Sequence, residues 1–361
     1  MAATRSFPLD ALRALAAQLI VLHHLSVYGP IAEAMHGLSP AISGWFYDYG
    51  RMAVQIFLVL GGYLSARALS SHEPGLHRSA PALLAQRYGR LAPPFLVAVG
   101  LTLAASWLVA PLLPALAPEQ VTLTQLLAHV LLLHDVLGQE ALTVGAWYVA
   151  IDFQLFALLL ALMWGLRRLG LSQTWRQGLA PVLVGALVTA SLLYFNRHSA
   201  QDAYAPYFFG AYGLGALLFW WQGWPTRLRW LSLGLLVSLL LLALALQFRE
   251  RLLVTAATGA VLMLWRQGPG PAWWVDRVQG LARHAYALFL VHFPVILLVN
   301  AVYAHHAESP APMPDALAPA ALLLAWGLAN LAAVPFHRWV EAPLLRWRPA
   351  VIRAGTAAPG R

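Results

Sequence analysis

Two ionisable side chains stand at a suggestive spacing in the first apolar segment, LDALRALAAQLIVLHHL, residues 9–25. Arg13 and His24 are eleven residues apart, which on an α-helix is about 20° past three full turns and roughly 16 Å along the axis. They share one stripe, with Asp10 within about 60° of Arg13 and His23 about 80° away on the other side. The stripe would run from one membrane boundary into the interior.

Each residue on this stripe also has a simpler interpretation. Arg13 could extend its guanidinium to the membrane boundary, and His24 could bond a carbonyl of a neighbouring helix. Because ionisable groups inside membranes are rare and usually face a cavity or a partner, we favour a functional role for His24. Arg13 stays open between the two interpretations.

A second basic pair lies in QRYGRLAPPF, residues 86–95. Arg87 and Arg90 are three residues apart, so on a helix their side chains face the same way and could bind phosphate oxygens together. The same spacing at the cytoplasmic start of a span also follows from the excess of positive charge there. Only the combination with Arg13 favours a binding site.

Composition places these residues in a membrane protein. The chain has 361 residues, of which 60% are hydrophobic and 10% charged, whereas soluble proteins carry about 25% charged residues. It has no cysteine, which excludes disulfides and thiolate metal sites. Runs of roughly 20 apolar residues predict an all-α bundle of about ten transmembrane helices. These lie near 7–28, 46–69, 91–113, 146–166, 178–195, 204–222, 228–247, 250–266, 281–303 and 316–339, with a weaker run at 121–134.

Arginine positions predict the orientation, since short cytoplasmic loops carry the positive excess. With the N-terminus inside, only Arg51, Arg197, Arg249 and Arg251 fall on the outer side, and both termini are cytoplasmic. We expect one transmembrane domain over residues 1–345 and a short basic cytoplasmic tail over 346–361. The formal net charge of +9 then serves membrane insertion, and nucleic acid binding is not expected.

The motifs resemble a known family, the membrane-bound acyltransferase-3 group, from about residue 5 to 345. The N-terminal motif of this family is a basic residue, then ten residues, then a histidine, and Arg13 and His24 match it. The family's cytoplasmic RxxR motif matches Arg87 and Arg90. Four more stretches match in the family's order, namely VQIFLVLGGYL (54–64), AWYVAIDFQLF (146–156), YALFLVHFPV (286–295) and HRWVEAPL (337–344). Gly61 stands where the family has serine, Asp152 where it has glutamate, and Phe289 where it often has tyrosine.

The resemblance implies a mechanism. Acyl-CoA, most simply acetyl-CoA, would bind at the cytoplasmic face with its phosphates on Arg87, Arg90 and Arg13. The acyl group would cross the membrane inside the protein to a hydroxyl of an extracytoplasmic carbohydrate or glycolipid. His24 would be the general base or, less favoured, a transient acyl carrier. The expected location is the bacterial inner (plasma) membrane, among membrane lipids; the acceptor, the acyl chain length and the oligomeric state stay open.

The remaining candidates would line the acceptor side. Asp152 could orient His24 or hold the acceptor, and Trp147 and Tyr148 could stack on a sugar, although interfacial aromatics are more often belt residues. His292 could line the same tunnel or form a bond between helices. Glu341 is a candidate for substrate binding, with an ion pair to a neighbouring arginine as the favoured alternative.

Three other classes of function are weaker. No HxxxH or HExxH spacing occurs, so we expect no metal. A proton-coupled transporter or flippase could use Arg13, His24 and Asp152 as a relay, but no paired halves are evident. A lipid-linked glycosyltransferase would need carboxylates in the first outer loop, where only Glu33 and Asp48 are available.

Overall fold

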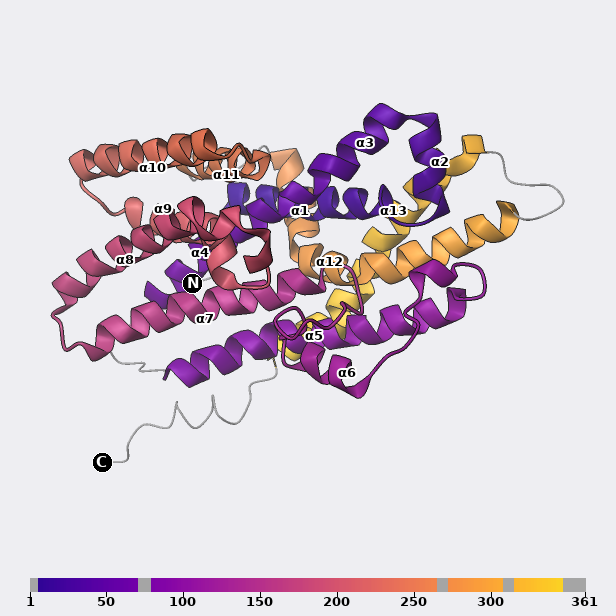
Figure 1. The fold of residues 1–361 in the computed structure, drawn as a ribbon, viewed down its shortest axis with the longest axis horizontal. Coiled ribbons are helices and arrows are strands. Elements are labelled where there is room, and N and C mark those ends of the chain that lie inside the picture. Colours follow the sequence, from indigo (N-terminus) through magenta and orange to yellow (C-terminus); the bar gives the residue numbers. More distant parts are fainter. Residues whose placement is uncertain (1–5, 71–78, 265–271, 308–314, 347–361) are drawn as a thin grey trace. The chain divides into compact units, whose positions relative to one another are not determined.

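In the computed structural model, which describes residues 6–70, 79–264, 272–307 and 315–346, every regular element is a helix (Figure 1). The α-helices are α1 (Phe7–Leu25), α2 (Pro30–Leu38), α3 (Pro40–Tyr49), α4 (Val54–Ser70), α5 (Ala80–Val109), α6 (Leu123–Val130), α7 (Ala146–Arg168), α8 (Gln173–Leu193), α9 (Ala205–Trp221), α10 (Thr226–Leu246), α11 (Glu250–Leu264), α12 (Ala272–Ala307), α13 (Ala318–Phe336) and α14 (Ala342–Arg346). The predicted all-helical fold is confirmed.

Each of the ten predicted spans overlaps a long helix, and the weaker run at 121–134 contains the short α6. Within the described ranges, seven helical stretches are long and apolar enough to cross a membrane, or eight if α1 and α2, bent by 92°, form one broken span. α9 has 17 residues and the described part of α11 has 15, near the lower end of the roughly 17–25 residues of membrane-crossing helices. The chain is therefore a polytopic membrane protein built as an all-α helical bundle.

The chain divides into two compact units, and the division falls within α4, α5 and α7. Unit 1 comprises Met1–Val54, Arg90–Val149 and Pro269–Trp347, and unit 2 comprises Gln55–Gly89, Ala150–Gly268 and Arg348–Arg361. The assignment of residues 1–345 to one domain stays a prediction. The predicted tail lies outside the described residues beyond Arg346.

α12 is the central helix of unit 1. It packs against α1 and against α13, and 78% of its most apolar stretch is buried. α1 is also joined to α13 by side chains, because Gln18 Nε2 donates to Asn330 Oδ1 at 2.8 Å and Gln18 Oε1 accepts from Trp326 Nε1 at 2.8 Å. These contacts fix α1 between two helices of the C-terminal region.

In unit 2, α4 and α9 cross at two glycines. A Cβ on Gly62 would lie 1.7 Å from the Tyr212 carbonyl oxygen, and a Cβ on Gly215 would lie 1.9 Å from the Val59 carbonyl oxygen. Only glycine allows the two backbones to approach this closely, as is common where membrane helices pack. The crossing holds the middle of α4 against α9.

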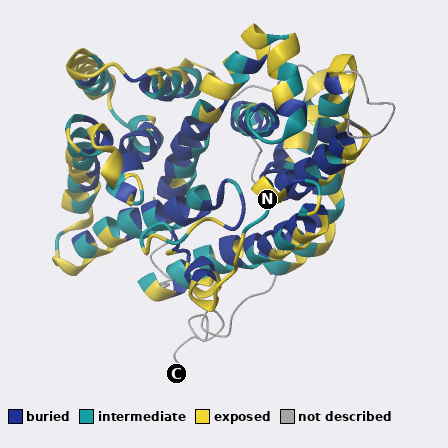
Figure 2. Ribbon diagram, turned by 45° about the vertical axis from the view of Figure 1, so that its right-hand side comes forward, coloured by how far each residue is buried: buried dark blue, intermediate teal, exposed yellow. Residues whose placement is uncertain are grey.

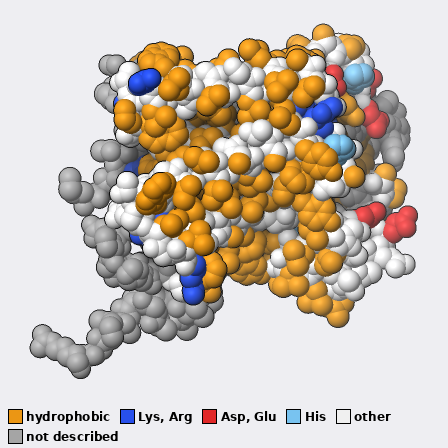
Figure 3. Space-filling view, turned by 60° about the vertical axis from the view of Figure 1, so that its left-hand side comes forward, with side chains coloured by type: hydrophobic (Ala, Val, Ile, Leu, Met, Phe, Trp, Pro, Cys, Tyr) orange, Lys and Arg blue, Asp and Glu red, His pale blue; other side chains and the backbone are white. Residues whose placement is uncertain are grey.

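Many helices have exposed residues along their length (Figure 2), and hydrophobic side chains cover much of the face drawn in Figure 3. Large apolar side chains are exposed on many helices. Trp107, Leu235 and Leu264 are among them, and only 6% of the most apolar stretch of α10 is buried. Contiguous exposed apolar surface of this kind is unfavourable in water and suits hydrocarbon. This surface agrees with a multi-pass membrane protein.

Candidate functional site

The turn after α1 holds His24 in place. α1 ends at Leu25, and the chain bends into α2 through Gly29, whose φ of +86° is rarely adopted by a residue with a Cβ. Asn300 of α12 fills the space beside this glycine, and its Oδ1 accepts a hydrogen bond from the Ile31 N–H at 3.0 Å. The last turn of α1 is thereby fixed against α12.

His24 contacts His292 of α12 across this packing. His24 Nδ1 lies 2.7 Å from His292 Nε2, the ring planes differ by 6°, and the ring centroids are 4.9 Å apart. This centroid separation is close to the N···N distance plus two ring radii, so the rings meet edge to edge in nearly one plane. His292 is fully buried, and its Nδ1 lies 3.1 Å from the Leu288 carbonyl oxygen.

The other nitrogen of His24 has a different environment. His24 is partly exposed, and its Nε2 makes no hydrogen bond within the described part of the chain. The adjacent His23 faces elsewhere, with its Nδ1 3.1 Å from the Phe46 carbonyl oxygen. The two histidines thus have different neighbours, as their spacing from Arg13 predicted.

Arg13 lies on the same unbroken helix as His24, half-buried. It forms no ion pair with any residue in the described ranges. Asp10 does not neutralise it, and the Asp10 Oδ2 atom is buried without a hydrogen-bond partner. Among the described residues, the side chain of Arg13 is thus not committed to a carboxylate.

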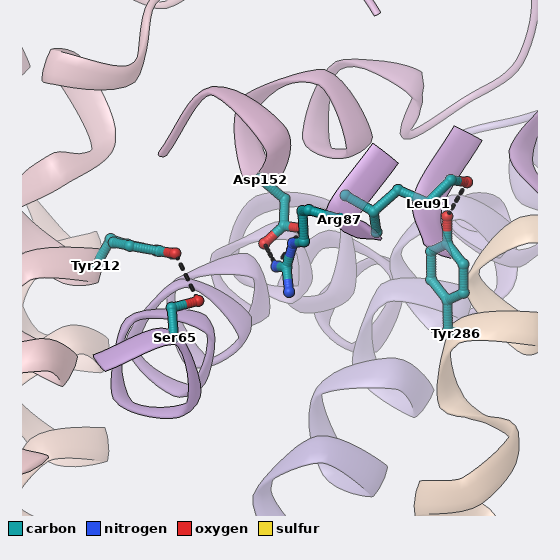
Figure 4. A network of polar contacts seen from close by, with 6 residues as sticks. All are labelled: Ser65, Arg87, Leu91, Asp152, Tyr212 and Tyr286. Carbon is teal, nitrogen blue, oxygen red and sulfur yellow. Dashed lines mark hydrogen bonds and ion pairs between the residues drawn. The ribbon is translucent and has the colours of Figure 1, made fainter. Parts of the chain in front are cut away.

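Arg87 of α5 and Asp152 of α7 form an ion pair in unit 2 (Figure 4). Arg87 Nη2 donates to both carboxylate oxygens, at 2.7 and 2.6 Å, and the guanidinium lies 5.2 Å from the ring centroid of Phe156. The sequence suggested separate roles for these residues, one toward donor phosphates and one toward the base or the acceptor. The structure couples them directly, and their separation of 65 positions in the sequence hides this pairing from sequence patterns.

Arg90 lies one helical turn after Arg87 on α5, and it is exposed. The chain therefore presents the predicted RxxR pair with one member held by a carboxylate and the other accessible from outside the protein.

Aromatic rings surround the histidine pair. Trp147 and Tyr148 pack edge to face at 6.1 Å, Tyr148 contacts Phe289 at 5.4 Å, and Phe289 lies 6.2 Å from His292, all between ring centroids. Tyr28 lies 5.8 Å from His24 on the other side. The sequence singled out Trp147, Tyr148 and His292 but not Tyr28, whose only signal is its place one turn after His24.

Glu341 lies in a π-helical turn, His337–Glu341, at the end of α13. It is buried, and its Oε2 atom lies 2.9 Å from His337 Nδ1. The partner of Glu341 is thus His337, four residues earlier in the chain, and not the neighbouring Arg338. The substrate-binding role of Glu341 stays a prediction. Elsewhere in the described ranges, no three His, Asp or Glu side chains group closely enough to hold a metal ion.

Comparison with known proteins decides the class of this site. A family model described as an acyltransferase domain matches residues 8–333. The chain belongs to the acyltransferase-3 family. It is therefore an enzyme that transfers acyl groups, and it requires an acyl donor and an acceptor. No curated protein and no solved structure gives a significant match.

Two departures from the acyltransferase-3 pattern lie together. A Cβ on Gly61 would be 3.5 Å from Asp152 Oδ1 and 3.2 Å from the ring of Tyr212, whose hydroxyl donates to Ser65 Oγ at 2.8 Å. A residue without a hydroxyl and a carboxylate on a shorter stem therefore occur at one place, beside Arg87. A serine at position 61 would bring its hydroxyl close to this carboxylate.

Proposed function

We propose that this acyltransferase transfers an acyl group, expected to be acetyl, from cytoplasmic acetyl-CoA across the bacterial inner membrane. The acceptor is a hydroxyl of an extracytoplasmic carbohydrate or glycolipid. The observation that carries the proposal is the placing of His24, whose partly exposed ring keeps Nε2 without a partner in the described residues. A neutral imidazole with a free nitrogen is the usual general base in enzymes.

The reaction balances with His24 alone as the proton carrier. His24 Nε2 takes the proton of the acceptor hydroxyl while the oxygen of that hydroxyl attacks the carbonyl carbon of the thioester. The C–O bond forms, the C–S bond breaks, and the proton returns from the imidazolium to the CoA thiolate. Positioned general bases of this kind contribute about 10²–10⁴ in rate.

Basic side chains support an anionic donor. Arg90 is exposed on α5, and Arg13 lies on the stripe of α1 that leads to His24, so both suit the phosphates of CoA. Arg87 would join them, although its guanidinium also contacts Asp152. The proposal assigns Arg90 and Arg13 to donor affinity and Arg87 to both donor binding and the ion pair.

The aromatic rings near the histidines support a carbohydrate acceptor. Trp147 and Tyr148 begin α7, and Tyr148 is connected through Phe289 to His292 by ring contacts. Faces of aromatic rings and a nearby imidazole are suitable for a sugar, which has both apolar C–H faces and hydroxyl groups.

The test compares two adjacent histidines. Purified protein in nanodiscs is assayed for acetyl-CoA consumption with a mixture of extracted surface glycans, and CoA binding is followed in parallel. We expect His24→Gln to bind CoA but to lose about 10²–10⁴ in turnover, and His23→Gln to retain turnover. Arg90→Gln should weaken CoA binding with little change in the maximal rate.

Opposite results would redirect the assignment. If His24→Gln turns over at the rate of wild type, His24 is not the base. If wild type neither binds nor consumes acetyl-CoA or longer acyl-CoAs, the donor is wrong, and proton-coupled transport of a glycan or lipid intermediate becomes the function to test.

A further inference from the structure

We infer that His292 is a positioning residue that fixes the tautomer of His24, so that Nε2 of His24 carries the lone pair that accepts the proton. The inference rests on the proposed role of His24 as base and adds the reason why one particular nitrogen acts. In this inference His292 does not contact the acceptor but acts through His24.

The argument begins at a backbone carbonyl. The Leu288 carbonyl oxygen can only accept a hydrogen bond, so His292 Nδ1, at 3.1 Å, must carry a hydrogen. A neutral imidazole has one N–H, and His292 Nε2 therefore presents its lone pair. His24 Nδ1, at 2.7 Å from that nitrogen, must then be the donor.

The chain of bonds leaves one nitrogen for chemistry. With Nδ1 of His24 donating to His292, the neutral ring of His24 has its lone pair on Nε2, which faces away from the bond and has no partner in the described residues. The opposite tautomer would place the lone pairs of His24 Nδ1 and His292 Nε2 against each other at 2.7 Å, which is repulsive. Since His292 is fully buried, water cannot relieve that repulsion.

The same bond assists the reaction itself. When His24 takes the proton of the acceptor hydroxyl it becomes an imidazolium, and its Nδ1–H bond to the neutral His292 Nε2 becomes charge-assisted and stronger. The bond is thus stronger in the transition state than in the ground state, which is the condition for raising the catalytic rate. His292 is buried and its Nδ1 bonds to the Leu288 carbonyl oxygen, so its ring is held in the orientation that accepts this hydrogen bond.

Two substitutions of His292 separate positioning from structure. In His292→Gln the side-chain Oε1 can occupy the place of Nε2 and accept from His24, whereas His292→Leu removes the acceptor. We expect His292→Leu to lower kcat about 10²-fold or more with the KM for acetyl-CoA unchanged, and His292→Gln to recover at least tenfold of that loss. His305→Leu, at an exposed position of the same helix, is the control and should retain kcat.

A spectroscopic measurement reads the tautomer without turnover. Nitrogen-15 shifts of labelled histidine distinguish N–H from lone-pair nitrogens, and the spectrum of His24→Gln assigns the signal of His24 among the 13 histidines. We expect Nδ1–H in wild type and a mixture of tautomers in His292→Leu. An Nε2–H tautomer of His24 in wild type, or full kcat in a folded His292→Leu variant, would overturn the inference. The proposed function would still stand if His24→Gln were inactive. An active His24→Gln would instead overturn the proposed function.

Discussion

Arg87 and Asp152 carry opposite charges with only 19% and 7% of their side chains exposed. Removing one partner of such a pair leaves an uncompensated buried charge, which costs about 3–5 kcal/mol, whereas replacing both with apolar groups is often nearly neutral. We expect Arg87→Leu to lower the unfolding temperature markedly, and Arg87→Leu with Asp152→Leu to restore most of it. Thermal unfolding in detergent checks both. A double variant as unstable as the single one would mean that packing, not charge, fixes this pair.

His129 and His134 lie outside the spanning helices, and their rings stack with centroids 4.3 Å apart. The two residues differ in their hydrogen bonds. His129 Nδ1 donates to the Gln125 carbonyl oxygen and its Nε2 accepts from the Leu142 N–H, at 2.8 and 3.0 Å. Both ring nitrogens of His134 are buried without a hydrogen bond to the described residues, and His134 Nε2 lies 3.5 Å from Asp135 Oδ2. Burial, and to a lesser degree the neighbouring His129, lowers the pKa of His134 to about 4.

This difference predicts a pH dependence. The folded state binds a proton at His134 more weakly than the unfolded state, so its stability is full above pH 6.5 and falls as the pH decreases from 6.5 towards 4. His134→Phe should remove this part of the acid sensitivity and change the stability at pH 8 by less than about 1 kcal/mol, because no hydrogen bond of His134 to the described residues is lost. Unfolding temperatures at pH 8 and pH 5 measure the effect.

The matched variant is His129→Phe, which loses two made hydrogen bonds and should be destabilised by about 1–3 kcal/mol. Equal effects of the two substitutions would mean that the two hydrogen bonds of His129 contribute no more to stability than the contact of His134 with Asp135.

Single residues were predictable where helix geometry alone decides their direction. The alignment of Arg13 with His24 and the divergence of His23 follow from 3.6 residues per turn. The partners were not predictable, because His24 and His292 are 268 residues apart and one sequence contains no record of which helices touch. Arg87 and Asp152 were both singled out, yet their ion pair appears only when α5 and α7 are packed.

Among the elements, the crossing of α4 and α9 is the most sensitive to a small change. Gly62→Ala or Gly215→Ala would place a methyl group within 2 Å of a backbone oxygen, so the helices must separate and the carbonyl cannot move aside cheaply. We expect either variant to lose most folded protein in detergent, as measured by fluorescence-detected size exclusion. Gly234→Ala, which meets nothing within 4 Å on α10, should behave like wild type; normal folding of the crossing variants would show that the backbones can part.

The apolar runs predicted all ten long segments, because hydrocarbon selects for about 20 consecutive apolar residues. They misplaced several ends. α12 begins at Ala272, before the predicted 281, and α5 begins at Ala80, before the predicted 91. Backbone hydrogen bonds continue where the side chains become polar, so hydropathy underestimates these helices. For α9 the predicted 204–222 agrees with Ala205–Trp221 to within one residue at each end.

For the whole molecule, orientation is a direct test of the arginine distribution. The chain has no cysteine, so single cysteines report accessibility without a background. Ser172→Cys precedes α8 and Ser199→Cys follows it, and both serines are exposed. In intact cells we expect an impermeant maleimide to label Ser199→Cys but not Ser172→Cys, because the first lies on the predicted outer side. Labelling of Ser172→Cys but not of Ser199→Cys would mean that the orientation is the reverse of the predicted one and that the proposed donor site faces outward.

The hydrogen-bond chain that starts at His24 ends inside α12. His292 Nδ1 is held by the Leu288 carbonyl, which cannot take up a proton and pass it on, so the chain has no exit on that side. In the proposed mechanism, a proton gained at His24 would therefore leave by the way it came or with the thiol product. An enzyme that opens to both faces of an energised membrane would otherwise leak the proton gradient with every turnover. If His24 acts as the proposed base, the contact of His292 with its own backbone would allow proton transfer at the site without proton conduction through it.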